Sequence, residues 1–198
     1  MVKVAWLMFA VVVAACAWQA SAVRTQRGVQ AGRPALSPAS PADVDTSGPI
    51  DVPVAGIAVS ALHDNFFDAR TGHVHNALDI MAARGTPVVA AVDGTIHKLD
   101  SSRNGGLTIY EFDRAQALSY DYAHLDRYAD GLSEGQAVRR GEIIGYVGST
   151  GNAKANAPHL HFAIERLGAS RQWSRGTPVN PYPILVARGV TTPASAPR

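Results

Sequence analysis

Two histidines with one residue between them, His159 and His161, are the side chains of this sequence that most directly suggest chemistry. Apolar residues occupy alternate positions from 160 to 164, and this period of two is typical of a half-buried strand. Both imidazoles then point away from the apolar face and are available to react. Upstream, His75 and Asp79 are four residues apart, an even spacing that also puts them on one face of an extended chain. Imidazole and carboxylate are zinc ligands, so the sequence predicts two strands that present paired ligands to one ion.

Short strands separated by turns are expected to position these ligands. The apolar run Thr86–Val92 leads through Asp93-Gly94, a favoured hairpin turn sequence, into Thr95–Leu99, so we predict a buried hairpin. The segments Gly106–Phe112 and Ala117–His124 flank a polar stretch and predict a second antiparallel pair.

His124 is expected to end the second strand of that pair. Steps of two back from His124 reach Tyr122 and Tyr120, so we predict that the imidazole shares a face with two phenols. We interpret both tyrosines as packing residues, with a contact to substrate as the alternative. Val, Ile, Thr, Tyr and glycine-containing turns dominate this region, and long amphipathic helices are hard to find. The sequence therefore predicts a mainly β fold, a small antiparallel β-sheet domain.

The length and composition limit the kind of protein this chain can be. It has 198 residues, 46% of them hydrophobic, which suffices for one domain with a core but not for a second large domain. The formal net charge is +2, and the Lys and Arg residues are scattered along the sequence. Proteins that bind nucleic acid gather basic residues into a patch, so we expect no nucleic-acid partner. We predict a monomer.

The first 22 residues have the pattern of an export signal. Lys3 precedes an apolar run from Val4 to Ala15 that is too short to span a bilayer comfortably. Two processing sites compete, because Val13-Ala14-Ala15-Cys16 resembles a bacterial lipobox and Ala20-Ser21-Ala22 fits ordinary signal cleavage. Cys16 is the sole cysteine of the chain, so an internal disulfide is excluded. We favour lipid attachment at Cys16, which predicts a periplasmic lipoprotein of the outer membrane; cleavage after Ala22 would give a secreted protein.

Three further segments follow the signal. Residues 23–53 are rich in Ala, Pro, Ser, Gly and Arg, and we interpret them as a flexible linker, with a segment that inhibits the site as the alternative. Residues 54–188 are the predicted folded domain. Residues 189–198 carry Thr, Pro, Ala and Ser and are predicted to be a disordered tail.

Seven short motifs in this domain occur in the order and spacing of a known family. They are His75-x-x-x-Asp79, Gly85-Thr-Pro-Val88, Asp93-Gly94, Tyr122-Ala-His-Leu125, Gly141-x-x-x-Gly145, Gly148-Ser-Thr-Gly151 and Pro158-His-Leu-His-Phe162. Each motif is weak alone, but the ordered set is specific. Over roughly Ser60 to Leu185, the chain resembles the M23 metallopeptidases of the LytM and lysostaphin type.

The resemblance implies a fold and a role for each of five residues. The fold is the lysostaphin-type domain, a duplicated hybrid motif in which a small antiparallel sheet carries an open groove. Carried over by position, His75, Asp79 and His161 become the ligands of one Zn²⁺ ion per domain. His124 and His159 become the catalytic histidines, and which of them is the general base stays open. Two histidines, one carboxylate and an open position for water are a common catalytic zinc set.

Several other residues have competing interpretations. His73 is the main rival as a ligand because it forms a second His-x-His pattern with His75, but it has no counterpart in the family motif. Ala77 departs from the His-x-Gly-x-Asp pattern of many relatives and alters no ligand. Arg70 matches a Phe-x-x-Arg motif that suggests a substrate contact. We expect His63 and His97 to be structural, and Gly148, Gly151 and Asn152 to serve a turn that needs positive φ.

Two function hypotheses follow from the resemblance. The first is a zinc-dependent endopeptidase that hydrolyses peptide cross-links of peptidoglycan in the cell envelope. The second is a catalytically inactive regulator of the same fold that binds and activates a cell-wall amidase; such relatives typically lack several metal ligands. The bond that would be cleaved stays open, because the side chains that select it come from loops that the sequence does not place.

Overall fold

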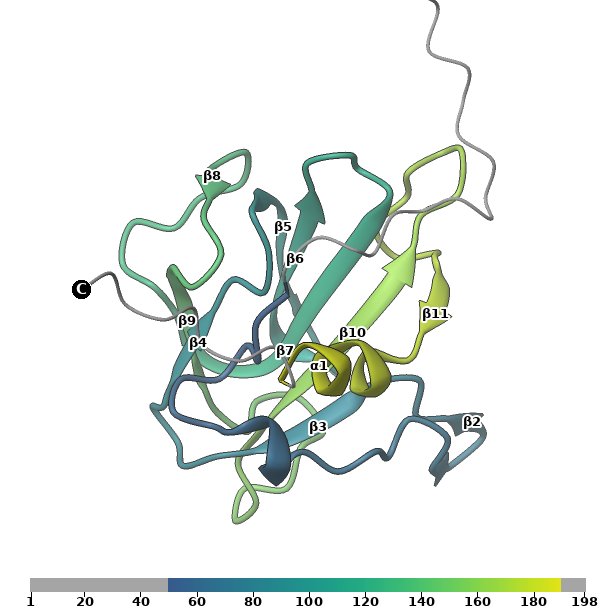
Figure 1. Cartoon of the computed structure of the whole chain (residues 1–198). Coiled ribbons are helices and arrows are strands. Elements are labelled where there is room, and N and C mark those ends of the chain that lie inside the picture. The colour runs from purple at the N-terminus through teal and green to yellow at the C-terminus, as the bar shows by residue number, and fades with distance from the viewer. Residues whose placement is uncertain (1–49, 190–198) are drawn as a thin grey trace, which may run out of the picture. The chain divides into compact units, whose positions relative to one another are not determined.

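The computed structural model describes residues 50–189, which form antiparallel strands and a single α-helix (Figure 1). Every strand pairing among these residues is antiparallel, which confirms the predicted mainly β fold. In chain order the elements are η1 (Val59–Ala61), β1 (Ala69–Arg70), β2 (His73–Val74), β3 (Leu78–Met81), β4 (Pro87–Val89), β5 (Gly94–Ser102), β6 (Gly106–Asp113), β7 (Leu118–Tyr128), β8 (Ala137–Val138), β9 (Ile143–Val147), β10 (His159–Arg166), β11 (Thr177–Val179) and α1 (Pro181–Gly189).

Strand β10 is the centre of the part of the sheet that matters for function. One edge of β10 pairs with β7, and the other edge pairs first with β3 and then with β11. In this register His161 lies opposite Asp79 of β3 and Ala123 of β7. The alternate residues of β10 are at most 1% exposed and join the core; they are Leu160, Phe162 and Ile164. The predicted division of this segment into an apolar face and a histidine face is therefore confirmed.

The predicted hairpin over Thr86–Leu99 is wrong. Strand β4 pairs with β9, and β5 pairs with β6 and β8. A tight hairpin turn needs positive φ at its central residues, and neither Asp93 nor Gly94 has it. Gly94 serves close packing instead, since a Cβ there would lie 2.4 Å from the carbonyl oxygen of Phe112.

Strand β7 does not end at His124 as predicted, but continues to Tyr128 through a β-bulge. Leu107 of β6 pairs with Leu125 and Ile109 pairs with Tyr122, so the single residue between them opposes two residues of β7. His124 is one of those two and has φ 61°. Because a bulge re-aims side chains, His124 lies near His159 and His161 and not on the face of Tyr122. The prediction that His124 shares a face with the two phenols is wrong for this reason.

The short helix α1 was not predicted, although its start carries a recognisable signal. The side-chain oxygen of Asn180 accepts a hydrogen bond from the backbone N–H of Tyr182, and Pro181 occupies the first helical position. The helix packs against β10 and η1 (Figure 1). Its Leu185 is buried in the core.

Residues 50–53, which the sequence places in the linker, hydrogen-bond to the folded domain. The backbone N–H of Asp51 donates to Ala91 and the carbonyl of Pro53 accepts from Val89. The predicted export signal and nearly all of the linker and tail lie outside the described residues. Within residues 50–189, no helix is long and apolar enough to cross a membrane.

Candidate metal centre

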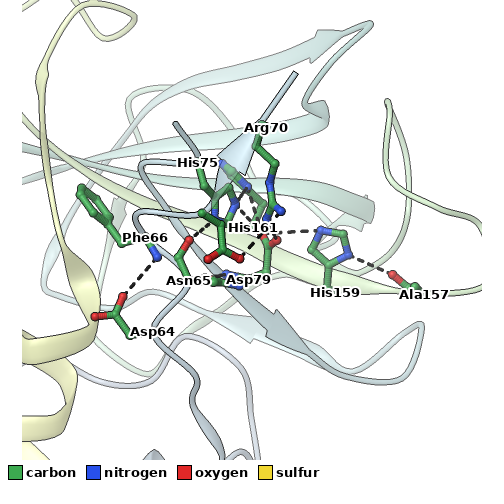
Figure 2. Close-up of polar contacts among 10 residues, drawn as sticks. Asp64, Asn65, Phe66, Arg70, His75, Asp79, Ala157, His159 and His161 are labelled. Atoms are coloured by element: carbon green, nitrogen blue, oxygen red, sulfur yellow. Dashed lines mark hydrogen bonds and ion pairs between the residues drawn. The ribbon is translucent and has the colours of Figure 1, made fainter. Parts of the chain in front are cut away.

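Three side chains with metal-binding atoms converge beside β10: His75, Asp79 and His161 (Figure 2). The Oδ1 atom of Asp79 lies 2.9 Å from Nε2 of His75 and 3.1 Å from Nδ1 of His161, and these two nitrogens are 3.1 Å apart. Atoms with these separations can all lie about 2.0–2.1 Å from one point, the length of zinc bonds to nitrogen and oxygen. The geometry therefore suits one small metal ion.

The positions of the ring proton and the lone pair of His75 also favour a bound cation. Nδ1 of His75 donates to the carbonyl oxygen of Asn65 at 3.0 Å, so in the neutral ring Nε2 presents a lone pair to the Asp79 carboxylate. Two lone pairs 2.9 Å apart repel unless a proton or a cation lies between them. When a proton and not a cation lies between these atoms, the His161 and His75 rings donate to the Asp79 carboxylate. Burial opposes ionisation of Asp79, but these contacts outweigh it and hold the pKa of Asp79 well below its usual range. The carboxylate is thus ionised and able to bind a metal.

The chain reaches this arrangement by a different path from the predicted one. Asp79 belongs to β3 and points to the same face as His161, as expected. His75 does not belong to a strand, and Asn76 has φ 57°, so the period-two argument that placed His75 and Asp79 on one face is wrong. A left-handed residue turns the chain, and Asn tolerates this conformation better than most residues. Ala77 is fully buried, and its methyl group is accommodated without separating the two side chains.

Two more histidines border the three donors. Nδ1 of His124 bonds to the carbonyl of Thr150 and Nδ1 of His159 to the carbonyl of Ala157, both at 2.9 Å. These contacts assign the ring proton to Nδ1 and leave Nε2 with a lone pair. Nε2 of His159 lies 3.7 Å from Oδ1 of Asp79. Both rings therefore offer Nε2 as a proton acceptor.

The environment of His124 keeps its ring neutral. Burial is the larger cause that lowers the pKa of His124, and the positive charge that His161 can carry is the second; together they lower this pKa to about 4. The ring centroid of His124 is 5.0 Å from that of His159 and 5.5 Å from that of His161. All five residues that the sequence singled out are therefore brought together, with His124 supplied by the bulge in β7.

Other candidate residues divide into those that join the cluster and those that do not. Arg70 donates to Oδ2 of Asp79 at 2.9 Å, so its contact in this structure is with the predicted ligand. His73 is exposed and bonds to the carbonyl of Thr71, and it is not part of the donor cluster found in the described residues. His97 stacks on Phe112. Tyr120 and Tyr122 are buried core residues, which favours packing over substrate contact.

One residue that contacts two members of the cluster was not predicted from the sequence. Asn65 accepts the Nδ1–H of His75 with its backbone carbonyl and the backbone N–H of Asp79 with its side chain. The turn glycines also differ from expectation, since Gly151 has φ 71° but Gly148 and Asn152 do not have positive φ.

Comparison with known proteins gives a family match and several relatives. Residues 73–181 match the model of peptidase family M23. The L-Ala–D-Glu endopeptidase of Bacillus subtilis (strain 168) is 34% identical over 119 residues, which are 58% of this chain and 35% of that protein. The DD-carboxypeptidase/endopeptidase Mpg of Neisseria meningitidis serogroup B (strain MC58) is 36% identical over 117 residues, 59% of this chain and 24% of that protein. The chain thus matches about a third of the length of the Bacillus subtilis protein and about a quarter of the length of the Neisseria meningitidis protein.

A solved structure shares the fold. The catalytic domain of the antimicrobial peptidase lysostaphin from Staphylococcus simulans superimposes with a TM-score of 0.50 and 30% sequence identity. The alignment covers 70% of this chain and 87% of that domain. The likeness therefore extends over most of a catalytic domain.

Proposed function

Since this chain belongs to peptidase family M23, we propose that it is a zinc-dependent endopeptidase that hydrolyses peptide cross-links of peptidoglycan. The observation that carries the proposal is the convergence of His75, Asp79 and His161, with His124 and His159 beside them. The predicted inactive regulator would lack several of these positions. Their joint presence favours the enzyme.

Each residue of the site has a distinct task in the proposed reaction. His75, Asp79 and His161 would hold the zinc ion, and Arg70 would fix the second oxygen of the Asp79 carboxylate. Zinc would supply Lewis-acid polarisation of the scissile carbonyl and would acidify a water molecule.

The two other histidines move or hold the protons. Nε2 of either His124 or His159 can accept the proton of the attacking water, because both rings keep their own proton on Nδ1. The same atoms, once protonated, can donate to the developing oxyanion or to the leaving amine. The carbonyls of Thr150 and Ala157 accept the Nδ1–H of these rings and hold their orientation in both protonation states.

The substrate class is inferred from the names of the relatives. One relative is named for an L-Ala–D-Glu bond and another for a DD-carboxypeptidase and endopeptidase activity. D-configured residues in peptide linkage are a feature of peptidoglycan stems and cross-bridges. We propose the same polymer as the substrate and, from the sequence pattern of residues 1–22, an exported protein that works in the cell envelope, anchored by lipid on Cys16.

A cleavage assay with defined muropeptides tests the proposal. Zinc-loaded protein is expected to convert cross-linked muropeptides to monomers, detected by liquid chromatography and mass spectrometry, and a panel of D-Ala–diaminopimelate and glycine-bridged substrates identifies the bond. His161→Ala should abolish both zinc uptake and cleavage, whereas the matched change His73→Ala should preserve both. Intact cross-links in every substrate after incubation with zinc-loaded protein would refute the proposal.

A further inference from the structure

We propose that Asn65 is a positioning residue of the metal centre, which holds the ring of His75 and the backbone of Asp79 at the same time (Figure 2). This inference rests on the proposed function, because it assigns to Asn65 a share of the zinc affinity. It adds to the five side chains of the site a residue that contacts no metal.

The side chain of Asn65 takes the place of a missing strand neighbour. Strand β3 pairs with β10 on one edge, and among the described residues no other strand pairs with it. The N–H of Asp79 points to the free edge and donates to Oδ1 of Asn65 at 3.1 Å. Because this N–H faces away from β10, Asp79 and His161 form a non-hydrogen-bonded pair of the antiparallel ladder. The side chains of such a pair lie closer together than those of a hydrogen-bonded pair. The amide of Asn65 thereby favours the short separation between the two side chains.

The backbone of Asn65 acts on the other side of the site. Its carbonyl oxygen accepts the Nδ1–H of His75 at 3.0 Å and so selects the tautomer with a lone pair on Nε2. A ligating imidazole usually donates its second ring N–H to such an acceptor, which fixes the orientation of the ring. His75 is 10 residues from Asn65 along the chain, so the contact also joins two separate loops.

The loop that carries Asn65 is held by bonds on both sides. The carbonyls of Phe66 and Asp68 accept from the backbone N–H groups of Asn76 and His75, each at 2.9 Å. Before Asn65, the carboxylate of Asp64 accepts from the N–H of Phe66 at 3.1 Å, and Asp64 also contacts the side chain of Asn180. Asn180 caps α1, so the loop is tied to the helix that packs on β10. Asn65 is therefore placed by the fold before any metal binds.

Zinc affinity of the purified protein, measured by competition with a chromophoric chelator, tests this role. Asn65→Ala removes the acceptor for Asp79 and keeps the backbone carbonyl, and we expect it to weaken zinc binding by about 10–100-fold. Asn65→Leu keeps the volume without the acceptor and should show the same loss, which guards against misfolding of the alanine variant. Asn65→Asp restores an acceptor in the same place and should bind zinc at least as tightly as the wild type.

A stability control separates positioning from folding. Tyr128→Phe deletes a hydroxyl that donates to the carbonyls of Asp100 at 2.6 Å and Thr108 at 3.3 Å, and neither of these residues belongs to the metal centre. It should lower the melting temperature and leave zinc affinity within about threefold of the wild type. Wild-type affinity in both Asn65→Ala and Asn65→Leu, or weak binding in Asn65→Asp, would overturn the assignment. Failure of the wild type itself to bind zinc would overturn the proposed function and this inference with it.

Discussion

Glu111 is a buried carboxyl group in the core, far from solvent and outside the proposed chemistry, and it should make the folded state sensitive to pH. Its side chain is fully buried. Oε2 accepts from the hydroxyl of Tyr122 at 2.5 Å, and that hydroxyl accepts from the backbone N–H of Ala91. Oε1 has no hydrogen-bond partner among the described residues. Burial raises the pKa of Glu111 to about 8 from an ordinary value of 4.5, despite the opposing bond from Tyr122.

The magnitude follows from the difference between the two pKa values. Because the folded pKa is the higher one, the folded state binds more protons than the unfolded state between about pH 4.5 and 8. The contribution of Glu111 to the free energy of unfolding is therefore highest below pH 4.5 and falls with rising pH, by up to about 1.4 kcal/mol per pH unit within this window. From pH 5 to pH 8 the loss attributable to Glu111 is about 3–4 kcal/mol.

The variant Glu111→Gln isolates this contribution. The amide keeps an acceptor for Tyr122 and cannot ionise, so its stability should lack the decline that Glu111 causes. Its unpaired amide hydrogens cost about 1–3 kcal/mol at every pH, which shifts the whole curve without changing its slope. Urea unfolding of both proteins at pH 5, 6, 7 and 8 should therefore show the variant gaining about 3–4 kcal/mol on the wild type across the series.

A difference curve is needed because other groups also titrate. His124 and Asp79 have shifted pKa values of their own, but they are present in both proteins and cancel in the subtraction. A difference in unfolding free energy that stays constant from pH 5 to pH 8 would refute the reasoning, since it would mean that Glu111 keeps the same charge in the folded and unfolded states.

Three further predictions concern the site and its supporting backbone. His124→Ala and His159→Ala should each lower muropeptide cleavage by about 100-fold or more and keep zinc affinity within about tenfold, as measured by chromatography and chelator competition; loss of zinc binding in both would show that they act as ligands. Chelation of the metal should lower the melting temperature, because zinc at about 100 times its Kd would stabilise the fold by about 2.7 kcal/mol. Gly148→Ala places a Cβ 2.3 Å from the backbone nitrogen of Asp126, so it should cost about 2 kcal/mol or more in urea unfolding. Gly168→Ala meets no atom within 4 Å and should be neutral; equal effects would exclude the packing argument.

The residues of regular strands were the predictable part of this protein. The alternation in β10 correctly indicated which side chains are buried, because a period of two has a single geometric meaning in an extended chain. The same logic failed at His75 and His124, whose surroundings contain a residue with positive φ. A period-two count assumes an unbroken strand. Asn and His adopt positive φ more often than most residues, but neither residue type at positions 76 and 124 is specific enough to mark the break.

Asn65 was missed for a different physical reason. Its contacts join residues 10 and 14 positions away along the chain, through a backbone carbonyl and a side-chain amide. A backbone carbonyl carries no residue signature, and a single Asn in a loop is most simply interpreted as a turn former. The helix α1, in contrast, has a signal in the sequence, because Asn180-Pro181 is a recognisable helix start. It was not predicted because the helix is short and only long amphipathic helices were considered.

The candidate site lies where the regular sheet is interrupted, and this coincidence has a physical explanation. Along one edge of β10 the partner changes from β3 to β11, along the other edge β7 bulges at His124, and before β3 the chain turns at Asn76. Regular strands direct every second side chain straight out from the sheet, so side chains from three neighbouring segments would stand parallel and stay apart. Bulges and left-handed residues cost stability, and they tilt side chains toward a common point. Deleting Ala123 removes the extra residue of the bulge and would place His124 directly opposite His161 in the β7–β10 register. The variant should therefore bind zinc through His75, Asp79 and His161 but cleave muropeptides poorly, because the His124 ring loses the Thr150 carbonyl that orients it.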